Sequence, residues 1–316
     1  MSKPIVYIDQ NILDKLHKNP HAKLAEDLRI NFQVIFSEEN LAEVERCGDQ
    51  KAQYAATFAL LNPKYLRVSF DENGHLLPTA SLEDFPFEGC LEKRRQIVPG
   101  FEKIKMTLHK PLLKALGGLT EKTFDEIHEE TKSAYEEVRQ ISGDDSKDVT
   151  ALIEEKKRSS KEFLSAVSDY TGMETIRRSV NAKPVELNNF QGKDAIARIW
   201  SELSKSDYIK DNNVSFERFF GFENIPSTIH EDSAVRYKIY LLHTMLNAIG
   251  YFTDDSILKE KRFEASQSDA MHLTYAAFAD KFLSFDMKLC RKAGAIYSHL
   301  GVGPRVYLLQ EEKKSQ

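Results

Sequence analysis

The chain has 316 residues, of which 41% are hydrophobic and 29% charged, and its formal net charge is −5. This composition is typical of a folded globular protein, and no apolar run approaches the roughly 20 residues that span a bilayer, so no membrane partner is expected. The acidic total does not indicate a general nucleic-acid binder, although it is compatible with a basic groove or with carboxylates gathered at a metal site.

The first segment alternates between strand and helix patterns. Continuous apolar runs predict strands at 4–8, 32–36 and 65–70. Helices are expected at 11–18 and 22–30, and a third, interrupted helix is expected to begin after the N-cap Ser37 and to end near Leu61. Strands that alternate with helices in this way indicate a parallel sheet with right-handed crossovers.

The middle of the chain is charged and has helical periodicity. Apolar positions recur every three or four residues on both sides of the sequence SGDDSKD, which indicates an antiparallel helical hairpin with a turn at 142–148. A further apolar helix is expected at 233–251. The aromatic sequence FERFFGFENIP (216–226) is interpreted as core packing rather than as a platform for stacked bases.

The strand and helix alternation returns near the C-terminus. A helix is predicted at 268–280 with Ser268 as its N-cap, followed by a strand at 281–285, a helix at 287–295 and a last strand at 305–309. The predicted fold is therefore α/β, with a three-layer α/β/α arrangement and a central parallel sheet. Both ends of the chain, 1–74 and 231–316, build this domain, and a mainly α-helical insertion, 75–230, interrupts it.

Acidic residues stand at the ends of these predicted strands. Asp9 follows the first strand and Asp286 follows the strand at 281–285, while Glu43 and Asp269 lie on helices next to the sheet. Ligands collect beyond the carboxyl ends of parallel strands, and four acids that meet there repel one another unless a cation lies among them. Oxygen ligands select hard cations, which predicts Mg²⁺ or Mn²⁺ rather than zinc.

Each acid also has a simpler interpretation. Asp9 and Asp286 are suitable N-caps, Glu43 is compatible with a solvated helix position, and Asp269 can compensate a helix dipole. The metal site therefore depends on the four acids together. The three cysteines, Cys47, Cys90 and Cys290, match no zinc or disulfide spacing, which favours a cytoplasmic location.

Three short motifs resemble the PIN domain, a family of metal-dependent nucleases. They are IVYIDQNIL near the N-terminus, VIFSEENLAEV around the second strand, and SDAMHLTYAAFADKFLSFDMKL near the C-terminus. The resemblance covers about residues 1–72 and 262–316, and the long insertion departs from it. It implies a three-layer fold and an endonuclease, most often acting on RNA.

The resemblance also implies roles for particular residues. Asp9, Glu43, Asp269 and Asp286 match the acidic quartet that holds the metal ion and supports catalysis. Asn11 and Ser284 match the accessory polar positions of the family. Three further candidates for substrate contact come from position and charge rather than from the resemblance: His272, one turn after Asp269, and Arg94 and Arg95 in the basic run 92–110. For His272 a packed, hydrogen-bonded histidine is the simpler alternative, and for the two arginines a solvated helix face is the alternative.

The sequence is also compatible with other substrates and functions. The substrate is expected to be RNA, with DNA as the alternative, and the insertion offers a surface for a protein partner or for self-association. A binding or regulatory module without turnover would also use this fold. A phosphohydrolase that needs a second aspartate two residues after the first is disfavoured, because Asn11 stands at that position.

Overall fold

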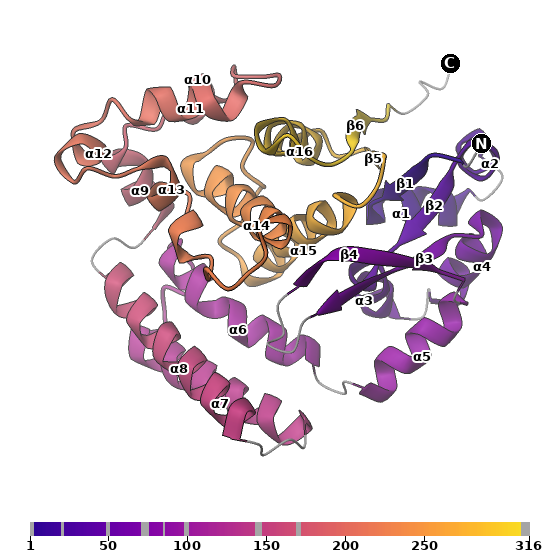
Figure 1. Ribbon diagram of the computed structural model, residues 1–316, viewed down its shortest axis with the longest axis horizontal. Helices are drawn as coiled ribbons and strands as arrows, with labels where there is room; N and C mark the ends of the chain where they lie inside the picture. Colours follow the sequence, from indigo (N-terminus) through magenta and orange to yellow (C-terminus); the bar gives the residue numbers. More distant parts are fainter. Residues whose placement is uncertain are drawn as a thin grey trace.

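The computed structural model describes residues 3–19, 22–48, 51–70, 76–84, 86–97, 101–142, 147–168 and 172–310. Its strands are β1 (Ile5–Ile8), β2 (Gln33–Phe36), β3 (Lys64–Phe70), β4 (Leu76–Glu83), β5 (Lys281–Ser284) and β6 (Arg305–Leu308). They form one six-stranded sheet in the order β4-β3-β2-β1-β5-β6 (Figure 1). The chain is therefore α/β, as predicted, and strands from its two ends lie side by side in the sheet.

The sheet is mixed, whereas the sequence predicted a parallel sheet. The five predicted strands are present and pair in parallel, but β4 pairs antiparallel with β3. Strand β4 contains Pro78 and lies at the edge of the sheet, where proline is tolerated. The predicted insertion thus contributes a strand to the sheet.

Successive residues of β1 face opposite sides of the sheet and are buried on both. Val6 and Ile8 pack on one side, while Tyr7 packs on the other. Burial on both faces explains the continuous apolar sequence of the strand and produces three layers.

One layer of helices comes from the N-terminal part of the chain. Its apolar side chains pack against Val6, Ile8 and Val34 of the sheet. The helices are α1 (Gln10–Lys18), α2 (Lys23–Asn31), α3 (Glu38–Arg46), α4 (Lys51–Leu61) and α5 (Phe87–Ile97). The opposite face is covered mainly by α14 (Glu231–Ile249), α15 (Glu260–Ala276) and α16 (Met287–Leu300).

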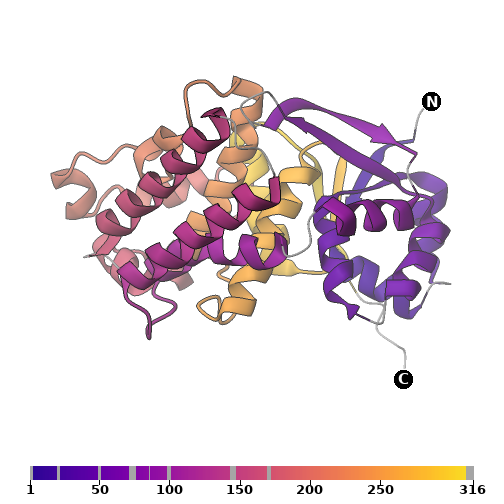
Figure 2. The same ribbon diagram turned by 90° about the horizontal axis from the view of Figure 1, so that it is seen from below.

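The remaining helices lie between α5 and α14 in the sequence. They are α6 (Phe101–Ala115), α7 (Phe124–Ser142), α8 (Lys147–Val167), α9 (Met173–Ser179), α10 (Pro184–Leu187), α11 (Ala195–Leu203), α12 (Asp207–Asp211) and α13 (Phe216–Phe219), followed by the 3₁₀ helix η3 (Phe222–Asn224). Helices α7 and α8 pack side by side, as the predicted hairpin requires, and project away from the sheet (Figure 2). Residues 143–146 of the predicted turn lie outside the described residues.

The aromatic residues at 216–222 are packing residues, as predicted. Phe220 is fully buried, and it lies against Trp200 and Phe216 in the core beside α14. Within the described part of the chain, no helix combines the length and the apolar character that a membrane crossing requires.

The glycine that ends α14 provides a test of this packing. Gly250 has φ of +98°, and an added Cβ would lie 2.5 Å from Cγ of Pro184. We expect Gly250→Ala to lower the free energy of unfolding by about 3 kcal/mol, since both backbone strain and a steric clash result. Gly192→Ala is the control, because its φ of +84° is also strained but its Cβ would meet nothing within 4 Å. Urea unfolding in which both variants lose the same stability would contradict this account.

Candidate active site at the strand ends

The chain order of the strands changes direction at β1. Strands β2 and β3 extend the sheet on one side of β1, whereas β5 and β6, from the other end of the chain, extend it on the other side. Ile8, the last residue of β1, pairs with Leu283 of β5. Asp9 and Asp286 therefore leave the same edge of the sheet at its topological switch point, where α/β proteins bind ligands.

Asp9 is almost completely buried and is the N-cap of α1. Its carboxylate accepts hydrogen bonds from Ser284 Oγ (2.5 Å), Asn11 Nδ2 (2.6 Å) and the Ile12 amide (3.3 Å). Burial nevertheless raises the pKa of Asp9 to about 7, against the opposing effects of these bonds and of the nearby His272. The N-cap interpretation of Asp9 is thus confirmed, and its role as a metal ligand stays a prediction.

Ser284 and Asn11 connect Asp9 to the segment that leads into α16. Ser284 Oγ accepts a hydrogen bond from the Asp286 amide (2.8 Å), and Asn11 Oδ1 accepts one from the Phe285 amide (3.0 Å). Asp286 itself caps α16 by accepting from the Leu289 amide at 2.9 Å. Ser284 and Asn11, the two predicted accessory residues, thus contact Asp9 directly and fix the backbone next to Asp286.

The third acid, Glu43 of α3, contacts α15. Its two oxygens bind Ser268 Oγ (2.9 Å) and His272 Nε2 (2.8 Å). The prediction that Ser268 caps a helix was wrong, since α15 begins at Glu260 and Ser268 lies within it. Its spacing of four residues from His272 places both side chains toward α3.

His272 is 1% exposed, and both of its ring nitrogens are engaged inside the protein. Nδ1 lies 2.6 Å from the Tyr7 hydroxyl, which lies 2.7 Å from Ser37 Oγ. Burial lowers the pKa of His272. The nearby negative charges of Glu43, Glu39 and Asp9 raise it by more than burial lowers it, so the net pKa is about 9. The imidazolium in turn holds the pKa of Glu43 below its ordinary value, although burial acts in the opposite direction.

A fifth acid, Glu39, belongs to the same cluster and was not predicted as a site residue. It is 4% exposed and accepts hydrogen bonds from Ser268 Oγ (2.6 Å) and Lys105 Nζ (3.1 Å). Arg46 lies 3.7 Å from both Glu39 and Glu43. The spacing of Glu39 and Glu43, one helical turn apart on the same face of α3, is the sequence signal that could have identified it.

Asp269, the fourth acid of the predicted quartet, adjoins a buried ion pair. Burial is the main reason why its pKa is well above the ordinary value, and the charge of Asp254 adds to this effect, whereas Lys292 and His272 oppose it. Lys292 is fully buried and binds Asp254 Oδ1 (2.7 Å) and Asn247 Oδ1 (3.1 Å). No sequence signal distinguished Lys292, since it directly follows Arg291 in a helix that also carries Lys288.

His243 of α14 lies beside this ion pair. It is fully buried, and neither ring nitrogen has a hydrogen-bond partner among the described residues. Burial and the positive charge of Lys292 lower its pKa from 6.5 to about 3, against the opposing charge of Asp254.

This histidine predicts a pH-dependent stability. Between about pH 6.5 and pH 3 the unfolded chain binds a proton at this position that the folded chain excludes, so stability falls as the pH falls. We expect the slope of unfolding free energy against pH to decrease in His243→Leu by up to about 1.4 kcal/mol per pH unit in this range. Urea titrations of both proteins across the range measure it, and parallel curves would contradict the buried neutral state.

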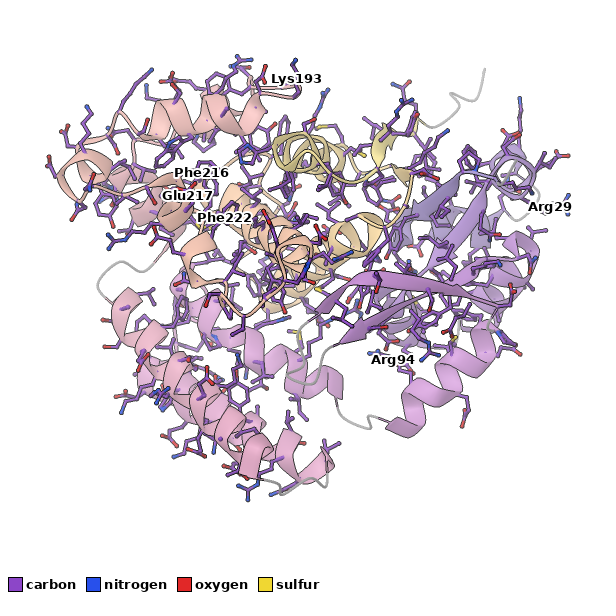
Figure 3. All side chains as sticks on the ribbon, in the orientation of Figure 1. Arg29, Arg94, Lys193, Phe216, Glu217 and Phe222 are labelled. Atoms are coloured by element: carbon purple, nitrogen blue, oxygen red, sulfur yellow. The ribbon has the colours of Figure 1, made fainter. Side chains whose placement is uncertain are left out.

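The predicted substrate-binding arginines lie on α5, which packs against α3. Arg94 forms ion pairs with Glu38 and Glu45 of α3 and is mostly buried. It lies far across the molecule from Phe216 and Phe222 (Figure 3). The side chain of Arg95 lies outside the described residues.

The carboxylate oxygens of the predicted quartet favour a hard cation, but these side chains do not converge on a single metal position. The described ranges contain no group of three or more His, Cys, Asp or Glu side chains placed to hold a metal ion. The chemistry nevertheless fits: buried Asp9 and half-buried Asp269 have raised pKa values, which a cation would lower. A carboxylate oxygen has two lone pairs, so the oxygens of Glu43 can keep their hydrogen bonds and still face an ion.

Comparison with known proteins identified no relative of this chain. No family model, no curated protein and no solved structure matches the chain.

Proposed function

We propose that the protein is a metal-dependent endonuclease, with Asp9, Glu43, Asp269 and Asp286 as the residues that hold Mg²⁺ or Mn²⁺. The observation that carries the proposal is the pairing of Ile8 with Leu283, which brings acids from both ends of the chain to one edge of the sheet. The PIN-like motifs contain the same four acids and support the same assignment.

A bound divalent ion would supply a Lewis acid that polarises the phosphate and lowers the pKa of a bound water. The protein's own residues orient this site. Ser284 and Asn11 hold the Asp9 carboxylate, while His272 and Ser268 hold Glu43. Because these side chains are packed and bonded before any ligand arrives, the carboxylates need little reorganisation on binding.

The substrate that we propose is RNA, with DNA as the alternative to be tested. Purified protein is incubated with labelled single-stranded RNA and DNA in Mg²⁺, in Mn²⁺ and in EDTA. We expect internal cleavage that leaves 5′-phosphate ends and that EDTA abolishes. Cleavage that persists in EDTA would exclude the metal-dependent mechanism, and cleavage of DNA alone would change the substrate but keep the site.

A binding or regulatory module without turnover is the second candidate. One observation favours it: Arg46, Lys105 and the His272 imidazolium already lie beside Glu39 and Glu43, so part of the acidic charge is balanced without a metal. Nucleic-acid binding without cleavage in either metal would support this second candidate.

A further inference from the structure

A pocket of about 580 Å³ lies between the loop that joins α14 to α15 and the helical segment of the chain. The loop contributes Thr253, Ser256 and Lys259, and α9 contributes Thr175 and Arg177. Part of the wall is apolar, formed by Leu116, Met173 and Ile257. This volume lies in the range of small-molecule sites and accommodates one nucleotide unit.

The pocket adjoins the acidic edge of the sheet. Asp254 lines the pocket, and the same carboxylate binds Lys292 next to Asp269. Lys288, two residues after Asp286, donates to the carbonyl of Thr253 (3.1 Å) and pairs with Asp255 (2.7 Å). The loop that forms one wall of the pocket is therefore fixed to the helix that Asp286 caps.

The lining of the pocket combines a hydrogen-bonded wall around Arg177 with the exposed side chain of Lys259. Arg177 donates to Glu174 (2.9 Å), to the Ala248 carbonyl (3.0 Å) and to Thr253 Oγ1 (3.3 Å), so α9 is tied to the loop. Lys259 is exposed, and its side chain has no ion-pair partner among the residues that the structure describes. The lining also contains the carboxylates of Glu174 and Asp254, which are paired with Arg177 and Lys292. With these charges balanced, the apolar wall, the hydroxyl groups and the ammonium of Lys259 suit a nucleobase, a sugar and a phosphate.

We propose that this pocket binds one nucleotide of the strand that flanks the phosphate at Asp9 and Asp286, with Lys259 contacting a backbone phosphate. The inference rests on the proposed nuclease function. It gives the helical segment between the two halves of the sheet a role in holding substrate, since α9 and the end of α6 form the far wall of the pocket.

Binding measurements on the full chain test the proposal separately from cleavage. Labelled RNA and DNA oligonucleotides of about ten residues are titrated by fluorescence anisotropy into protein that carries Asp9→Asn. Thr175→Trp fills the pocket and is expected to raise Kd at least about tenfold, because one nucleotide loses its contacts. Ser201→Trp, on the exposed surface of α11, is the matched control and is expected to keep Kd unchanged.

A second pair of variants avoids any effect of Thr175→Trp on folding. Lys259→Ala is expected to reduce the slope of log K against log salt by about 0.7, as the loss of one phosphate contact requires, whereas Lys205→Ala leaves the slope unchanged. Affinity and salt slope that stay at the parent values in Thr175→Trp and Lys259→Ala would overturn the pocket, as would the absence of binding to either oligonucleotide. Impaired binding in both pocket variants, together with parent protein (Asp9 intact) that cleaves neither RNA nor DNA in Mg²⁺ or Mn²⁺, would overturn the nuclease function and leave the pocket supported.

Discussion

Asp9→Asn is expected to lower the rate of metal-dependent cleavage by about 10³-fold, corresponding to about 4 kcal/mol of lost transition-state stabilisation. Asp9 lies at the switch point, where Ser284 and Asn11 hold its carboxylate. The substitution preserves size and removes a metal-binding charge. Single-turnover cleavage of labelled RNA in Mg²⁺ measures the effect, with Asp27→Asn on the exposed surface of α2 as the control.

The same variant is expected to fold at least as stably as the parent protein. Burial raises the folded-state pKa of Asp9 to about 7, above its pKa in the unfolded chain. Between these two pKa values the unfolded chain releases a proton that the folded chain keeps, so the protein loses stability as the pH rises toward 7. Asparagine is also a good N-cap for α1. Lost activity together with a lower melting temperature would indicate a folding defect and would contradict the functional role given to Asp9.

Lys292→Met is expected to lower the free energy of unfolding by about 3–5 kcal/mol, the largest stability effect that we predict. Lys292 is fully buried, and its removal leaves the Asp254 carboxylate without its cation at 2.7 Å. Guanidinium unfolding measures the loss. Lys288→Met on the same helix is the control, because its partner Asp255 is 92% exposed and surface pairs contribute about 1 kcal/mol or less.

The double variant Lys292→Met/Asp254→Asn identifies the cause. If the cost comes from an uncompensated buried charge, removing the charge of Asp254 restores most of the lost stability. If the cost comes only from lost packing, the second substitution adds to the first. Additive losses, or equal losses in the Lys292 and Lys288 variants, would contradict the buried ion pair.

The parts of the fold that follow from local pattern were predictable from the sequence. The apolar runs that end at Asp9 and before Asp286 identified both strands, and parallel pairing of these strands places the two acids at one edge. Strand β4 was missed because its sequence LLPTASLE has no continuous apolar run, and its Pro78 argues against a strand.

The contacts around the acids depend on tertiary packing and were only partly predictable. Ser268 was interpreted as an N-cap because its type favours that position, but its hydroxyl instead binds Glu39 and Glu43 across the helix interface. Lys292 has no local feature that indicates burial, since its pairing with Asp254 joins positions 38 residues apart. Periodicity identifies faces of helices, whereas these contacts depend on how the faces meet.

The most direct test of the central claim is a crystal structure of the protein soaked in Mn²⁺, with the ion located by its anomalous scattering. We predict a peak at the carboxyl ends of β1 and β5, within coordination distance of Asp9 and at least one of Glu43, Asp269 and Asp286. An ion bound elsewhere, or strand ends that stay free of metal at saturating Mn²⁺, would contradict the proposal that acids from both ends of the chain form one metal-dependent active site.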